Sequence, residues 1–476
     1  MRIWIVLLVS MSALISPFGA TTFLPAMNVL REVLDISASQ VNVAVTTYMI
    51  AQAFAPAFMG ALSDSSGRRL AFIICFIIFF VANIGLALQT NYIALLLLRI
   101  LQAMGGTAGI ALSYAVVADV STSAERGVYM GYAGAGILAG PAFGPTIGGI
   151  LAQYLGWRST FWFLVIYAGV LLVLFVFFFP ETCRNIVGNG SIPPSGLNRS
   201  VISCIQARKN RLQRPSDVER IKPPKRKFTL PNPLVTFRIC LEKESGIILL
   251  YNGLFFTAMM TTVYGIPYIY GKTYNLSELH LGLCFIANGV GSMASSLTMG
   301  HIVDWNFRRH AKLAGMPIIK GQQQDLTNFN IERVRLEIVL PSHVIGTIGL
   351  LIFGWTVHYG THIAFPEIGL VVIGFGISGA YNITNNLLID LHRDVPAATT
   401  AAVNFARCLL SAGGAAAIIP MVNAMGVGWT FTFMAAVSLL LFGVAVWIMK
   451  FGMAWRLEKA ERGSREMEEK ERGKGP

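Results

Sequence analysis

Two arginines lie inside long apolar stretches of this sequence, where a charged side chain is unfavourable unless it has polar partners. Arg99 is about 7 residues, or ~10 Å along a helix, inside one stretch, and Arg407 is about 9 residues, or ~13 Å, inside another. At such depth in a membrane a charge costs at least ~2.5 kcal/mol, so each guanidinium is expected to face a bundle interior or water. Either arginine could bind a substrate or take part in proton transfer. Arg99, which is followed by Gln102, could instead be a structural residue bonded to neighbouring carbonyls.

Carboxylates that could carry a proton lie at the ends of the apolar stretches, and none lies near the middle of one. Asp119 and Asp390 each precede a stretch rich in small residues, and they are 271 positions apart. Glu367 follows Pro366, which is a favoured place for an acid at a helix N-terminus. Proton transfer would therefore need these three acids or an indirect route around Arg99.

A short polar gap between two apolar stretches combines glycines, an acid and two arginines. Its glycines allow a tight turn with positive φ, and its acid could pair with a helix N-terminus or with a facing arginine such as Arg126. The spacing returns 240 positions later, so both copies are expected to join helices in a chain built from two repeated halves. The residues are Gly60, Asp64, Gly67, Arg68 and Arg69, and then Gly300, Asp304, Arg308 and Arg309.

One apolar stretch, 128–151, carries glycines four positions apart. This spacing places them on one face of a helix, where another helix can pack with the two backbones close together. Two prolines in phase with the glycines each remove a backbone hydrogen bond, so the span is expected to be thin and bendable. The stripe consists of Gly136, Gly140, Pro141, Gly144, Pro145, Gly148 and Gly149.

Other polar side chains within the apolar stretches are candidates for lining a cavity. The first stretch is weakened by Pro17 and Pro25, which are tolerated in a membrane where they face protein or a cavity. Several of the polar groups are also expected to form hydrogen bonds between helices. The candidates are Thr22, Tyr264, Tyr268, Asn288, Asn382, Asn385, Asn386 and Asn404.

The elements that must position these residues are membrane spans. The chain has 476 residues, of which 54% are hydrophobic and 13% charged, and the mean hydropathy is +0.60. Stretches of roughly 20 apolar residues can cross a bilayer, and the sequence predicts an all-α polytopic membrane protein with two six-helix bundles. The predicted spans are 3–26, 41–62, 70–89, 92–117, 128–151, 160–179, 246–270, 279–303, 338–357, 368–391, 398–423 and 429–449.

The domain boundaries follow from these spans. The predicted parts are an N-terminal bundle over 1–180, a central loop over 181–245, a C-terminal bundle over 246–450 and a tail over 451–476. The loop is rich in Pro, Ser, Lys and Arg, and a flexible linker is the favoured interpretation.

The net charge of +13 could suggest a nucleic-acid partner, but its distribution argues against one. Of 37 Lys and Arg residues, 31 fall in the even-numbered loops and the C-terminal tail. This bias places those segments in the cytoplasm.

The six cysteines have no paired spacing that would suggest disulfides or a zinc site, and we expect no metal. No catalytic constellation is evident at useful depth, so we do not expect an enzyme.

With these motifs in view, the chain resembles the major facilitator superfamily, and within it the twelve-spanning fungal drug:proton antiporters of the quinidine and multidrug resistance type. The loop 60–69, the Arg99 to Gly105 segment and the glycine and proline stripe resemble three motifs of that group. Pro180-Glu181-Thr182, Asp304-Trp305-Asn306 and Phe329-Asn330-Ile331-Glu332 are similar to its fungal branch.

The resemblance implies export of small organic molecules by alternating access, with the loop 60–69 acting as an inner latch. It implies a proton gradient as the energy source and no bound cofactor. We expect a monomer in the plasma membrane, with the vacuolar membrane as the alternative. Aromatic and amide groups around an arginine suit neutral, amphipathic or weakly acidic substrates. Two alternatives stay open: a facilitator or symporter for a nutrient or organic acid, and a membrane sensor that does not transport.

Overall fold

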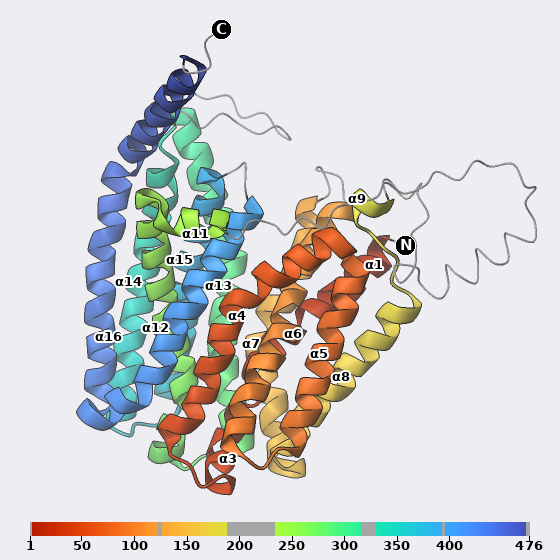
Figure 1. Cartoon of the computed structure of the whole chain (residues 1–476). Helices are drawn as coiled ribbons and strands as arrows, with labels where there is room; N and C mark the ends of the chain where they lie inside the picture. Colours follow the sequence, from red (N-terminus) through yellow and green to blue (C-terminus); the bar gives the residue numbers. More distant parts are fainter. Residues whose placement is uncertain (1, 121–125, 188–233, 316–328, 393–395, 473–476) are drawn as a thin grey trace, which may run out of the picture. The chain divides into compact units, whose positions relative to one another are not determined.

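The computed structural model describes residues 2–120, 126–187, 234–315, 329–392 and 396–472. Every element within these ranges is a helix (Figure 1), so the predicted all-α class is confirmed. The helices are α1 (Arg2–Ala13), α2 (Ile15–Thr21), η1 (Leu24–Ala26), α3 (Met27–Val33), α4 (Ala38–Ser66), α5 (Arg68–Leu88), α6 (Tyr92–Val120), α7 (Arg126–Leu155), α8 (Arg158–Phe177), α9 (Arg184–Val187), α11 (Leu234–Leu241), α12 (Lys243–Tyr274), α13 (Glu278–Leu313), α14 (Ile331–His358), α15 (Ala364–Leu391) and α16 (Pro396–Arg472).

All twelve predicted spans lie on these helices. Ten helical stretches of the described chain are long and apolar enough to cross a membrane. One of them, Ala398–Glu458 in α16, holds two predicted spans, which are separated by non-helical dihedrals at Gly426. The predicted span over 128–151 lies in α7. The chain is thus a multi-pass membrane protein.

The first span is broken, as its prolines and small residues predict. The helical stretch Ile3–Val33, which contains this span, consists of three short α-helices and a 3-10 turn, and Pro25 lies in that turn. Breaks in a membrane helix leave backbone groups that need other partners. The break after Thr21 therefore creates a local demand for hydrogen bonds, which a buried side chain meets as described below.

The helices group by their contacts into two units. The first contains Met1–Pro233, Thr262–Gly289 and Ala412–Pro420, and the second contains Leu234–Thr261, Val290–Ser411 and Met421–Pro476. These bounds cut through α12, α13 and α16. The division of the sequence into bundles at 181–245 stays a prediction.

Aromatic packing in the first unit fixes the ends of α5 and α8. The rings of Phe72 and Phe175 have centroids 4.8 Å apart, and Phe175 stacks on Phe179 at 4.4 Å. All three side chains are buried. This contact holds the start of α5 beside the segment that follows α8, which is where the polar cluster of this unit lies.

Close helix packing in the second unit holds the middles of α14 and α15 together. A Cβ atom on Gly376 would lie only 2.5 Å from the Cα atom of Gly346, so the two backbones approach as closely as glycine allows. The same two helices carry an ion pair, which joins Arg335 near the start of α14 to Asp390 near the end of α15.

The second copy of the polar gap does not form a loop, and that expectation is wrong. Gly67 ends α4 with φ of 108°, a left-handed conformation that favours glycine. The position 240 residues later is Phe307, for which such a conformation is strained. The helix α13 accordingly runs unbroken through Gly300 and Arg309 to Leu313.

Candidate functional site

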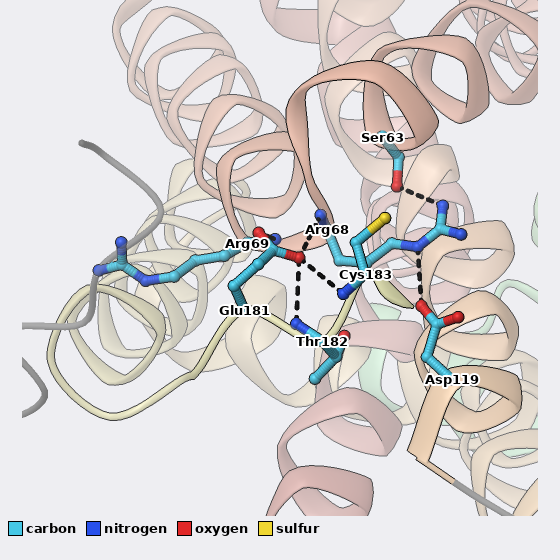
Figure 2. Close-up of polar contacts among 7 residues, drawn as sticks. All are labelled: Ser63, Arg68, Arg69, Asp119, Glu181, Thr182 and Cys183. Atoms are coloured by element: carbon cyan, nitrogen blue, oxygen red, sulfur yellow. Dashed lines mark hydrogen bonds and ion pairs between the residues drawn. The ribbon is translucent and has the colours of Figure 1, made fainter. Parts of the chain in front are cut away.

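A buried carboxylate holds the start of α5 in the first unit (Figure 2). Oε1 of Glu181 accepts hydrogen bonds from the backbone N–H groups of Arg68 at 2.9 Å, Thr182 at 3.0 Å and Cys183 at 2.9 Å. Its Oε2 atom accepts one from the N–H of Arg69 at 3.2 Å. The first N–H groups of a helix lack partners within the helix and favour an anion. Glu181 therefore caps α5 from the segment that follows α8.

The side chain of Arg68 joins this cap to two further helices. Its Nε atom donates to Oδ2 of Asp119 at 3.0 Å, and its Nη1 atom donates to Oγ of Ser63 at 2.8 Å (Figure 2). The Arg69 guanidinium donates to the carbonyl of Val176 at 2.7 Å. The ends of α4, α5, α6 and α8 thus meet in one polar cluster.

This geometry changes the expected partner of the α5 N-terminus. The sequence placed Asp64 there or beside Arg126, whereas the carboxylate found at that N-terminus is Glu181. The side chains of Asp64 and Arg126 lie outside the described part of the structure. Gly60 lies within α4, and a Cβ atom there would meet open space.

The second unit contains a matching ion pair. Arg335, near the start of α14, donates from Nη2 to Oδ2 of Asp390 at 2.9 Å and from Nε to the same atom at 3.2 Å. Arg335 follows Arg68 by 267 positions, close to the 271 that separate Asp119 from Asp390. The halves therefore repeat an arginine at the start of one helix and an aspartate at the end of the next.

The start of α14 is held differently, since its N-cap residue Asn330 accepts a hydrogen bond at Oδ1 from the backbone N–H of Arg333 at 2.9 Å. Glu332, in the first turn of α14, has a fully buried side chain and lies 3.1 Å from Nε of Arg456. Nη2 of Arg456 donates to the carbonyl of Phe329 at 2.7 Å. In the first unit the acid follows α8 and caps a helix, whereas here a base on α16 holds an acid on the helix itself.

The residues of the second polar gap, Gly300 to Arg309, take no part in the ion pair of Glu332 with Arg456. Arg309 lies 3.8 Å from Glu337, whose carboxylate also contacts His310 at 2.6 Å. The side chains of Asp304 and Arg308 are exposed, and a Cβ atom on Gly300 would meet open space.

Arg99 is enclosed by the broken first span. Its Nη1 atom donates to the carbonyl of Gly19 at 2.8 Å, which lies where α2 ends. Its guanidinium carbon lies 4.0 Å from the ring centroid of Phe23 and 4.3 Å from that of Tyr48. The side chain has 0% exposure. This arrangement matches the structural interpretation of Arg99, which compensates for the break in the first span.

A chain of amides extends from Arg99 into α5. Nη1 of Arg99 also donates to Oε1 of Gln102 at 2.5 Å, and Nε2 of Gln102 donates to Oδ1 of Asn83 at 2.7 Å. One turn further, Gly105 faces the backbone of α5, since a Cβ atom there would lie 2.7 Å from the carbonyl oxygen of Cys75. The motif on α6 thus fastens three helices of the first unit.

Arg407 has a different environment. Its Nη2 atom donates to Oδ1 of Asn404 at 2.6 Å, and its guanidinium carbon lies 5.2 Å from the ring centroid of Phe256. The ring of Phe256 in turn lies 4.5 Å from that of Tyr381. The side chain of Arg407 is half-buried.

The glycine face of α7 packs against the first span. Cβ atoms on Gly140, Gly144 and Gly148 would collide with Pro17, with Oγ1 of Thr21 and with the backbone of Thr22 respectively. The two backbones approach closely at Gly148, whereas Gly140 and Gly144 leave room for side chains of the first span. Pro141 and Pro145 lie within the helix, while the surroundings of Gly136 fall outside the described part.

A second face of α7 meets α13 within the same unit. A Cβ atom on Gly282 would lie 3.1 Å from the Cα atom of Gly149, and Oγ1 of Thr146 donates to the carbonyl of Gly282 at 3.2 Å. Both faces of α7 therefore depend on glycine.

The remaining predicted residues are divided between the two units. Asn382 donates to Ser296 at 3.5 Å, and the hydroxyl of Tyr264 lies 3.3 Å from the sulfur of Met49. Both contacts join helices, as expected for several members of this set. The others lie as follows: Thr22 and Asn288 are buried, Tyr268, Glu367 and Asn385 are half-buried, and Asn386 is exposed.

Sequence reasoning missed a buried histidine. Nδ1 of His343 lies 2.9 Å from the hydroxyl of Tyr251, and its Nε2 atom lies 2.8 Å from the carbonyl of Ser438. The ring also stacks on Phe255 with centroids 4.0 Å apart. A lone histidine in an apolar stretch gave no signal of these partners.

Among the described residues, no three His, Cys, Asp or Glu side chains could hold a metal ion.

Comparison with known proteins places these features in a family. The profile of the Major Facilitator Superfamily matches residues 9–416. The MFS-type transporter tstD of Talaromyces stipitatus is 38% identical over 98% of this chain and 86% of its own. Citrate exporter 1 of Aspergillus niger is 33% identical over 97% of this chain and 88% of its own. The xylose transporter XylE of E. coli shares the fold, with a TM-score of 0.65 and 15% identity over 94% of this chain and 97% of that one.

Proposed function

Because the chain belongs to the major facilitator superfamily, we propose that it is a secondary active transporter that exports small organic molecules by proton antiport with alternating access. The fungal relatives support transport as the general activity. The observation that carries export is the α7 stripe, in which Gly140, Gly144 and Gly148 lie directly against the first span. The similarity to a protein named as a citrate exporter supports the same direction.

The end acids offer a route for coupling. Asp119 is bonded to Arg68, and Asp390 is bonded to Arg335. A carboxylate that accepts a proton loses its charge and with it most of the attraction to its arginine. Proton uptake at these positions would therefore weaken the contacts between the helix ends. An exchanger must break such contacts when it changes between its two conformations.

Export is tested by dye efflux from a fungal host that lacks its own pumps. Cells that express the chain are loaded with a lipophilic fluorescent dye, and efflux is followed with and without a protonophore. The proposal requires faster efflux than in empty cells and loss of that gain with the protonophore. Equal retention at verified surface expression would argue against a broad exporter and favour a narrow transporter or a sensor.

The location and assembly are proposed as a plasma-membrane monomer. A fluorescent fusion would mark the vacuolar rim instead if the alternative location holds. Light scattering of the purified protein in detergent would reveal a mass above one chain if the protein is an oligomer.

A further inference from the structure

The first unit contains pieces of both halves of the sequence. Besides the first half it includes Thr262–Gly289 and Ala412–Pro420, which belong to α12, α13 and α16. Both pieces lie toward the ends of their spans that adjoin odd-numbered loops, and the charge bias of the sequence places those loops outside. Helices of the two halves are therefore joined in this unit at their outer ends.

Two asparagines of the first half make polar contacts with the second half here. Nδ2 of Asn28 on α3 donates to the carbonyl of Pro267 on α12 at 2.9 Å. Nδ2 of Asn42 on α4 donates to the carbonyl of Ala415 on α16 at 2.8 Å, and Asn42 is only 1% exposed. A Cβ atom on Gly271 would lie 2.7 Å from Nδ2 of Asn28, so this glycine makes room for the amide. Each asparagine thus ties one helix of the first half to one of the second.

These contacts suit an interface that opens and closes. An amide that leaves its carbonyl partner can bond to water instead, so the net contribution of such a bond is small. A cavity of about 10 Å³ lies beside both asparagines, and Arg31 and Tyr268 also line it. This is about the space that one water molecule needs. Water that enters from outside can therefore take over the amide groups as the helices part.

We propose that Asn28 and Asn42 are the outer gate of this chain. Their bonds to α12 and α16 hold the outer end closed, and both bonds break when the substrate path opens to the outside. The inference rests on the proposed function, because a gate at this end has a role only in a transporter with alternating access.

The test measures how often this end opens, by labelling a cysteine in the purified protein in detergent. The reporter is Ile419→Cys, since Ile419 lines the cavity and is 2% exposed. A water-soluble maleimide is added, and peptide mass spectrometry gives the labelling rates at position 419 and at Cys75, which is buried in the core of the same unit. Asn28→Ala and Asn42→Ala are each combined with the reporter.

The matched control is Asn91→Ala in the same reporter chain. Asn91 is exposed just before α6, and its Oδ1 atom accepts a hydrogen bond from the N–H of Ile93, two residues further on. The control therefore loses the same amide at the outer side without loss of a contact between the halves.

The ratio of the two labelling rates separates opening of this end from unfolding. Closure protects position 419, so its labelling rate follows the fraction of molecules that are open at this end. Loss of one hydrogen bond should raise that rate roughly two- to tenfold, with no rise at Cys75. Asn91→Ala should leave both rates unchanged.

Two results would overturn the proposal. One is an unchanged rate at position 419 in both Asn28→Ala and Asn42→Ala. The other is a parallel rise at Cys75, which would show that the whole unit has loosened. Labelling needs neither substrate nor gradient, so the two proposals fail separately: unchanged labelling with normal dye efflux removes the gate alone, and faster labelling without any efflux removes export alone.

Discussion

Nε of Arg68 donates to Oδ2 of Asp119 over 3.0 Å, and this bond joins the start of α5 to the end of α6. The second half of the chain repeats the relationship between Arg335 and Asp390, at the start of α14 and the end of α15. The repeated pairs occupy matching places in the two halves. We therefore expect the two pairs to have the same role in the transport cycle, and substitutions at either pair can test this.

Asp119→Asn should destabilise the protein and reduce export. The carboxylate of Asp119 has 14% exposure, so the pair is partly desolvated, and its loss should cost about 1–3 kcal/mol. Thermal unfolding of the purified variant measures the first effect and dye efflux the second. Asp304→Asn is the control for stability because its side chain is exposed. A melting temperature of Asp119→Asn equal to that of the control would contradict a structural role for the pair.

Glu181→Ala should loosen the start of α5. The substitution removes the acceptor of four backbone N–H groups, those of Arg68, Arg69, Thr182 and Cys183. Loss of a helix cap typically costs ~1 kcal/mol, and more is expected here because the site is buried. Hydrogen exchange should speed up at Arg68 and Arg69. Glu32→Ala, at an exposed position, should leave these amides unchanged, and unchanged exchange in Glu181→Ala would refute the cap.

Gly144→Val should abolish export or prevent folding, since its side chain would collide with Thr21. The matched control is Gly443→Val on α16, where a Cβ atom would meet no atom within 4 Å. Comparing the amounts of folded protein by fluorescence-detected gel filtration separates folding from transport. Normal export by Gly144→Val would show that the tight contact of α7 with the first span is dispensable.

Arg99→Lys should lower stability more than Arg407→Lys does. Lysine at position 99 cannot keep the planar contacts with Phe23 and Tyr48. It would also leave the Gly19 carbonyl or the Gln102 amide poorly bonded, at about 1–3 kcal/mol for each group left unpaired. Melting temperatures of the two variants provide the comparison. The reverse order would mean that Arg99 does not fasten the first span.

The sequence was sufficient for the helices but not for most of the contacts between them. Apolar length alone predicts the spans, and the prolines of the first span predict its breaks. The bond between Glu181 and the start of α5 spans 113 positions, so it depends on packing that local patterns do not encode. Arg335 could have been found, because it repeats Arg68 at nearly the offset of the two aspartates. The second loop was mispredicted because Phe307 stands where a turn requires a residue like Gly67.

In the proposed mechanism a proton gradient drives the transport of an organic molecule. The most direct measurement uses purified protein in proteoliposomes, with an imposed pH difference and the membrane potential clamped to zero by valinomycin and potassium. The probe is the lipophilic fluorescent dye whose efflux from cells tests export, and protein-free liposomes set the passive rate. We predict that the pH difference increases the flux more in proteoliposomes than in protein-free liposomes. Nigericin, which removes the pH difference, should abolish this additional flux. A protein-dependent flux that is the same with and without the pH difference would contradict proton antiport and indicate a facilitator.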